Sequence, residues 1–127
     1  MNGLHSSKYG SLTAGGEVNS PSVAIVILKW NGRTFLEQFL PSVMASTYLN
    51  KRVIVADNAS SDDSLEFLQT HFSTVEIIRN ESNEGYAKGY NSALKRIQSD
   101  YYVLLNSDVE VTPGWIEPVI GLMESDD

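Results

Sequence analysis

The stretch Val23-Ala24-Ile25-Val26-Ile27-Leu28 is the longest purely apolar run in this chain of 127 residues. It is short, mostly β-branched and followed by the turn signal Asn31-Gly32, a pattern typical of a strand buried on both faces of a sheet. Similar runs recur at Arg52–Ala56, Val75–Arg79 and Tyr101–Leu105. Each run is far shorter than a bilayer crossing requires, so the sequence predicts no transmembrane helix.

Segments with the apolar spacing of amphipathic helices lie between and after these runs. Their apolar residues fall within Phe35–Met44, Leu65–Leu68, Tyr86–Ile97 and Trp115–Leu122. We expect Ser61 or Asp62 to cap the second helix, Asn83 to cap the third, and Val119 and Leu122 to point inward from the fourth. The alternation of strand and helix predicts an α/β fold, a mostly parallel Rossmann-like sheet with helices on both faces.

The first residues of the chain, Met1–Pro21, differ in composition from the rest. They are rich in Gly, Ser and Asn and have no hydrophobic period, so we expect a disordered leader over 1–21 and one folded unit over 22–127. The leader lacks the basic start and long apolar segment of a secretory signal. The absence of cysteine excludes disulfides and thiolate metal sites and fits a cytoplasmic protein. The net charge of −7 argues against nucleic-acid binding.

Polar segments follow the predicted strands. Ligands of parallel α/β sheets bind at the carboxyl ends of the strands, so the segments of interest are Lys29–Arg33, Asp57–Asp62, Asn80–Gly85 and Asn106–Asp108. The first contains a single glycine, which excludes the dinucleotide-binding fingerprint and the phosphate-binding P-loop. It also contains no pair of acids, which a receiver-like phosphoacceptor domain needs after its first strand.

Three features have both a functional and a structural explanation. Asp57, expected at the edge of a loop, can accept a hydrogen bond from a ribose or a base N–H, whereas Ser60–Asp62 resemble any helix start. Asn106 and Asp108 suit Mg²⁺ or Mn²⁺, which would neutralise a diphosphate in this acidic protein, or they form an ordinary turn. Gly89 costs about 1 kcal/mol relative to Ala inside a helix, and permits close approach of a ligand or simply of the sheet.

Four blocks of the sequence are informative because they occur in a particular order along the chain: Val26–Gly32, Val55–Asp62, Asn83–Asn91 and Leu105–Asp108. Together they closely resemble the N-terminal half of family 2 glycosyltransferases, most of all the rhamnosyltransferase-like group of cell-surface polysaccharide synthesis. The resemblance covers about Val23–Met123 and implies the GT-A fold. There are two departures. Lys29 stands where the family commonly has a small polar residue, and Asn106 replaces the first Asp of the Asp-X-Asp metal motif.

The resemblance also implies roles for individual residues. Trp30 and Asn31 would line the nucleotide pocket, and Asp57 would accept a hydrogen bond from a pyrimidine base. Asp108 would be the ligand of the Mg²⁺ or Mn²⁺ ion that bridges the diphosphate. The other residues expected to shape the donor site are Asn83, Gly89, Asn91, Asn106 and Ser107.

The activity implied is metal-dependent transfer of a sugar from a UDP- or dTDP-sugar to a hydroxyl of a saccharide or lipid-linked acceptor. The family's general base lies well beyond the metal motif, so we expect it beyond Asp127 and expect this chain to bind the donor without transferring the sugar. The full-length enzyme would be cytoplasmic or membrane-associated. An edge strand left exposed predicts a homodimer. The alternative is a non-catalytic nucleotide-binding α/β module.

Overall fold

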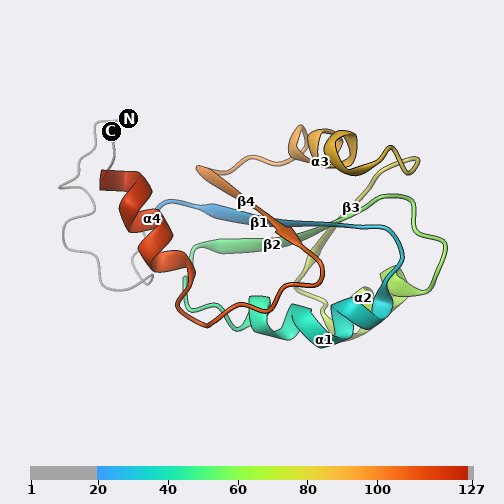
Figure 1. Ribbon diagram of the computed structural model, residues 1–127, viewed down its shortest axis with the longest axis horizontal. Helices are drawn as coiled ribbons and strands as arrows, with labels where there is room; N and C mark the ends of the chain where they lie inside the picture. The colour runs from blue at the N-terminus through green and yellow to red at the C-terminus, as the bar shows by residue number, and fades with distance from the viewer. Residues whose placement is uncertain (1–19, 126–127) are drawn as a thin grey trace.

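The computed structural model describes residues 20–125 (Figure 1). The predicted leader, 1–21, lies outside this range except for Ser20 and Pro21. Strands and helices alternate strictly along the chain, as predicted. The elements are β1 (Val23–Lys29), α1 (Arg33–Met44), β2 (Lys51–Asp57), α2 (Ser64–His71), β3 (Glu76–Arg79), α3 (Tyr86–Leu94), β4 (Tyr101–Asn106) and α4 (Ile116–Ser125).

The strands form one sheet in the order β3-β2-β1-β4, and every neighbouring pair is parallel. Val23 at the start of β1 is level with Lys51 of β2 and Tyr101 of β4, so the three strands begin together, and β4 ends one residue before the other two. In chain order, β2 and then β3 are added on one side of β1, and the chain then crosses over so that β4 pairs with the other side of β1. The topological switch point therefore lies between β1 and β4, and β4 ends the described sheet on that side.

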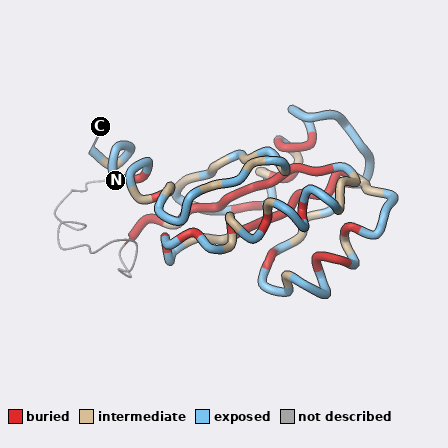
Figure 2. Tube along the Cα trace, turned by 60° about the horizontal axis from the view of Figure 1, so that its bottom comes forward, coloured by how far each residue is buried: buried red, intermediate tan, exposed pale blue. Residues whose placement is uncertain are grey.

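The helices divide between the two faces of the sheet (Figure 1). Residues of α1, α2 and α4 pack with alternate side chains of the strands in the larger core, and α3 covers the other face with Tyr90 and Ala93. Every residue of β1 is buried, and it runs as a continuous buried band through the centre of Figure 2. The predicted fold class is thus confirmed. None of the helices among residues 20–125 is long and apolar enough to span a membrane.

Some local expectations were wrong. The N-cap residues are Asp63 for α2 and Gly85 for α3, each later in the chain than predicted, although Asp62 Oδ1 accepts from the N–H of Ser64, the first residue of α2. In α4, Val119 and Leu122 are exposed, since the helix packs through Ile116 and Ile120 instead.

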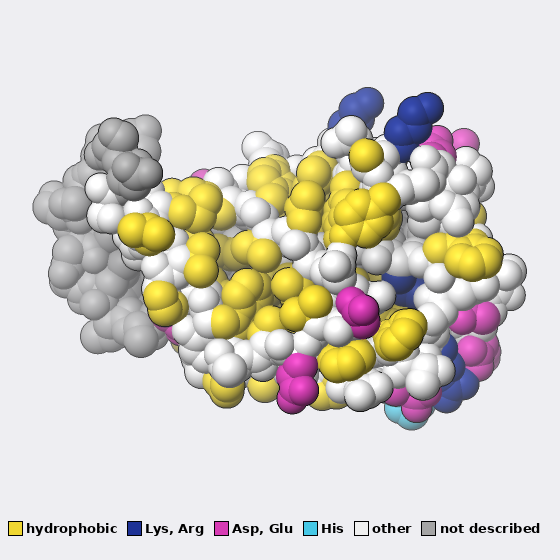
Figure 3. All heavy atoms as spheres, in the orientation of Figure 1, with side chains coloured by type: hydrophobic (Ala, Val, Ile, Leu, Met, Phe, Trp, Pro, Cys, Tyr) yellow, Lys and Arg dark blue, Asp and Glu magenta, His cyan; other side chains and the backbone are white. Residues whose placement is uncertain are grey.

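The side of the molecule that carries β4 is apolar. Tyr102 and Leu104 of this strand are 41% and 50% exposed. They lie on the same face as α3, which packs mainly on β1 and β2 and reaches the end of β4 through the Tyr86 and Tyr90 hydroxyls. Figure 3 shows hydrophobic side chains gathered across the middle of the view.

Candidate functional site

A pocket opens where the predicted site should be, at the carboxyl ends of β1 and β2. Its volume of 150 Å³ is below the ~300 Å³ at which ligand pockets usually begin, so it can hold only part of a nucleotide sugar. It is lined by Leu28, Lys29, Trp30, Asn58, Asn83, Gly85 and Tyr86. Trp30 and Tyr86 are 53% and 60% exposed, so both aromatic side chains remain accessible at the rim.

The turn after β1 is shaped by Asn31 and Gly32, which both have left-handed backbone angles, with φ of 56° and 82°. Asn31 fastens this turn to the loop after β2. Its N–H donates to the Ser60 hydroxyl at 2.6 Å, and its Oδ1 accepts from the N–H groups of Ser61 and Asp62 at 2.7 and 3.1 Å. Asn31 is therefore a structural anchor of the pocket, with its carbonyl oxygen already engaged.

Asp57 is fully buried at the end of β2 and pairs with Lys29. Its Oδ1 accepts from the Lys29 ammonium at 2.8 Å and its Oδ2 from the N–H of Ser60 at 3.0 Å. Burial raises the pKa of Asp57, but the hydrogen bonds from Lys29 and Ser60 outweigh it and hold the pKa below its ordinary value. The carboxylate thus lies beneath the pocket instead of lining it.

Asparagines that the sequence did not single out hold the pocket wall. Asn58 Nδ2 donates to Asn83 Oδ1 at 2.9 Å and to the Gly85 carbonyl at 3.2 Å, and Asn58 Oδ1 accepts from Asn80 at 3.0 Å. Asn83 Oδ1 also accepts from the N–H of Gly85. Asn58 and Asn80 directly follow the ends of β2 and β3, and that position was the signal that could have identified them.

Gly89 lies on the sheet-facing side of α3. A Cβ at this position would lie 3.0 Å from Asn58 Nδ2 and 3.0 Å from both terminal carbons of Leu28. The glycine thus lets α3 pack closely against the sheet and against the hydrogen-bonded asparagines. Asn91, two residues further on, is exposed and does not line the pocket.

Two tyrosines connect α3 to the end of β4. The Tyr90 hydroxyl accepts from the N–H of Leu28 at 3.4 Å and donates to the Leu105 carbonyl at 2.9 Å, so it bridges β1 and β4 at the switch point. Burial raises the pKa of Tyr90 above its ordinary value. Next to it, the Tyr86 hydroxyl donates to Oδ1 of Asn106.

The predicted metal position lies in the turn after β4. Asp108 is exposed and Ser107 half-buried. Within residues 20–125, no three His, Asp or Glu side chains gather to hold an ion by themselves. One carboxylate near the Asn106 amide fits the chemistry of Mg²⁺ or Mn²⁺, which commonly take few protein ligands and complete their shell with phosphate oxygens and water.

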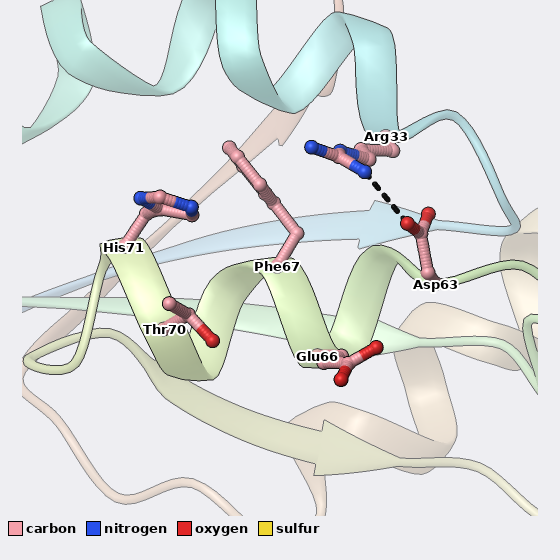
Figure 4. Close-up of a pocket in the computed structure, with 6 residues that line it drawn as sticks. All are labelled: Arg33, Asp63, Glu66, Phe67, Thr70 and His71. Atoms are coloured by element: carbon pink, nitrogen blue, oxygen red, sulfur yellow. Dashed lines mark hydrogen bonds and ion pairs between the residues drawn. The ribbon is translucent and has the colours of Figure 1, made fainter.

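A second hollow, between α1 and α2, has a structural explanation (Figure 4). Arg33 donates to Asp63 at 2.6 Å and its guanidinium lies 4.8 Å from the centre of the Phe67 ring, which packs in turn against His71. These contacts of Arg33 and Phe67 therefore hold α1 and α2 together.

Comparison with known proteins identifies the family. The model of "Glycosyl transferase family 2" matches residues 24–127. This chain belongs to glycosyl transferase family 2. A relative, the putative teichuronic acid biosynthesis glycosyltransferase TuaG of Bacillus subtilis, is 29% identical over 91 residues, which are 69% of this chain and 36% of TuaG.

Solved structures show the same fold as this family 2 chain. S. aureus TarS 1–349 in complex with UDP-GlcNAc matches with a TM-score of 0.73 at 17% identity, over 82% of this chain and 31% of TarS. The mannosyltransferase PcManGT from Pyrobaculum calidifontis, in complex with GDP-Man and Mn²⁺, matches with a TM-score of 0.69 at 17% identity, over 95% of this chain and 38% of that chain. The fold is thus that of GT-A glycosyltransferases. The chain spans about a third of the length of TuaG and TarS.

Proposed function

We propose that this chain forms the donor-binding part of an enzyme that transfers a sugar from a UDP- or dTDP-sugar to an acceptor hydroxyl in cell-surface polysaccharide synthesis. The observation that carries the proposal is the pocket at the carboxyl ends of β1 and β2, rimmed by Trp30 and Tyr86, in a family 2 chain. The UDP-GlcNAc complex of TarS and the name of TuaG support the donor class and the pathway. A rhamnosyl donor is a narrower hypothesis that rests on the resemblance in sequence.

The aromatic rim supplies the main apolar contact for a nucleoside. Stacking of a base on an exposed aromatic ring contributes about 1–3 kcal/mol and tolerates any base. Trp30 is the larger exposed ring, and it follows directly after β1, on a turn fixed by Asn31. Asn83, held by Asn58, lines the same pocket together with Gly85.

The diphosphate needs positive charge close by, and the cation among the residues that line this pocket, Lys29, is already paired with Asp57. We assign Asp108 as the protein ligand of Mg²⁺ or Mn²⁺, with Asn106 and Ser107 beside it. Such an ion stabilises the negative charge that develops on a departing nucleoside diphosphate. Asn106 contributes no charge of its own, so the ion keeps more of its positive charge for the phosphates.

The transfer itself needs a group that removes the acceptor proton. The acceptor oxygen forms a bond to the anomeric carbon, the bond from that carbon to the phosphate oxygen breaks with its electrons, and the hydroxyl proton passes to a carboxylate. We place that carboxylate in the part of the relatives that this chain does not span. Gly89 lets α3 pack on the sheet, and neither Gly89 nor Asn91 takes part in the chemistry in this proposal.

Calorimetric titration of UDP in the presence of Mn²⁺ tests donor binding. Trp30→Ala should weaken binding by about 1–3 kcal/mol, whereas Phe35→Ala should leave it unchanged, because Phe35 is 48% exposed on α1 and does not line the pocket. Absence of UDP binding by the unaltered chain, or equal loss in both variants, would refute the proposal.

A further inference from the structure

Tyr86 connects the pocket to the turn after β4. It is the first residue of α3 and lines the pocket, and its hydroxyl donates to Oδ1 of Asn106, the last residue of β4. The neighbouring Tyr90 hydroxyl donates to the carbonyl of Leu105, and the two tyrosine rings pack edge to face with their centres 5.0 Å apart. The two hydroxyl groups therefore tie successive residues at the end of β4 to α3.

Asn106 lies on the face of the sheet that α3 covers. It is paired in register with Leu28 of β1, and Leu28 belongs to the core cluster that contains Tyr90 and Ala93 of α3. Directly paired residues of neighbouring strands point to the same face of a sheet. Leu28 also lines the pocket. The Asn106 amide and the pocket thus share one face, at the carboxyl ends of β1 and β4.

The Tyr86 hydroxyl fixes which end of the Asn106 amide is left for a ligand. An asparagine side chain has an oxygen that accepts hydrogen bonds and an NH₂ group that donates two. Tyr86 engages the oxygen, and within residues 20–125 the NH₂ group has no hydrogen-bond partner. Without the hydroxyl, the amide would be free to turn and present either end. An aspartate at this position would offer no N–H and would repel a diphosphate.

We infer that Tyr86 is a positioning residue that holds the Asn106 amide by its oxygen, so that the NH₂ group donates a hydrogen bond to an oxygen of the nucleotide, on its diphosphate or its ribose. The inference rests on the proposed donor binding and deepens it. It gives the Tyr86 hydroxyl a task separate from that of its ring. It also gives Asn106 the task of a neutral donor, which the acid of an Asp-X-Asp motif cannot perform.

The test compares the affinities of the full chain for UDP and for uridine, each with Mn²⁺, by calorimetry. Tyr86→Phe keeps the ring and removes the hydroxyl, so UDP affinity should fall by about threefold to tenfold. Asn106→Asp should weaken UDP at least as much, whereas an asparagine that simply replaced a metal-binding acid would give tighter UDP binding once the acid is restored. A loss for UDP alone identifies the diphosphate as the acceptor, and an equal loss for uridine identifies the ribose.

The double variant Tyr86→Phe/Asn106→Ala should bind UDP no more weakly than Asn106→Ala, because the hydroxyl acts through the amide. Both positions are exposed, so circular dichroism should show an intact fold. Tyr102→Phe is the matched control: this tyrosine of β4 is 41% exposed, its hydroxyl donates to the Ile97 carbonyl at 2.9 Å, and it lies outside the pocket, so UDP affinity should not change.

Three results would overturn the inference alone: unchanged UDP affinity in Tyr86→Phe, tighter UDP binding in Asn106→Asp, or additive losses in the double variant. If the unaltered chain does not bind UDP, both the inference and the proposed function fail.

Discussion

Replacing Gly89 by alanine tests the packing of α3 on the sheet. An alanine Cβ would lie 3.0 Å from Asn58 Nδ2 and 3.0 Å from both terminal carbons of Leu28, closer than ordinary van der Waals contact. Gly121 in α4 is the matched control, because its Cβ would have no atom within 4 Å. Both glycines lie inside helices, so both substitutions gain the same helix propensity.

The expected magnitudes follow from these contacts. Alanine is favoured over glycine by about 1 kcal/mol inside a helix, so Gly121→Ala should raise the free energy of unfolding by up to that amount. At Gly89 the same gain is offset by overpacking, which costs about 1–3 kcal/mol. Displacement of Asn58 from Asn83 adds about 1 kcal/mol for a lost hydrogen bond. The net effect of Gly89→Ala is a loss of about 1–3 kcal/mol.

Urea unfolding followed by circular dichroism measures both variants under the same conditions. For a domain of this size, 1 kcal/mol corresponds to a shift of about 4–8 °C in Tm, so thermal melts resolve the difference as well. Equal stabilisation by Gly89→Ala and Gly121→Ala would refute the packing described for α3.

Three further predictions concern charge, metal and assembly. Because folding lowers the pKa of Asp57, its contribution to stability is complete above the unfolded pKa of about 4 and is lost as the pH falls through the folded value. The free energy of unfolding should therefore fall more steeply with acid in the unaltered chain than in Lys29→Met/Asp57→Leu. UDP binding should require Mn²⁺ and should be lost in Asp108→Ala but not in Glu110→Ala, which changes another exposed acid of the same segment. Affinity that is unaffected by a chelator would contradict the metal site. Light scattering should detect a dimer that Leu104→Lys dissociates, since Leu104 is 50% exposed on the strand at which the sheet ends; a monomer at every concentration would count against it.

The fold could be predicted because its signals are local. The run Val23–Leu28 agrees with β1 to within one residue, since a parallel strand covered on both faces must be apolar throughout. The order of strand and helix then fixes the class, because parallel neighbours need crossover helices. The first residue of each helix could be predicted less exactly, because it depends on contacts between loops that are distant in sequence.

The Lys29–Asp57 pair could not be predicted from the sequence, and the reason is register. In the sheet these residues are directly paired, at the last position of two neighbouring parallel strands. A shift of one residue in either strand would have separated them, and nothing in a single sequence fixes that alignment. Asp57 was therefore expected at a loop edge, as a group that could face a ligand, whereas its neighbour in the sheet makes it an internal counter-ion.

Several polar side chains around the pocket are already hydrogen-bonded within the protein, and this affects how a nucleotide sugar would bind under the proposed function. The hydrogen bonds of Asn31, Asn58 and Lys29 are made within the protein and hold the loops in place, so the pocket is formed before a ligand binds. A preformed wall loses little conformational entropy on binding, but it offers few free donors to the ligand. Affinity must then come from stacking on the rim and from charge at the diphosphate. Under the proposed function that charge comes from a cation at the turn after β4, so nucleotide affinity depends on this turn as well as on the aromatic rim of the pocket.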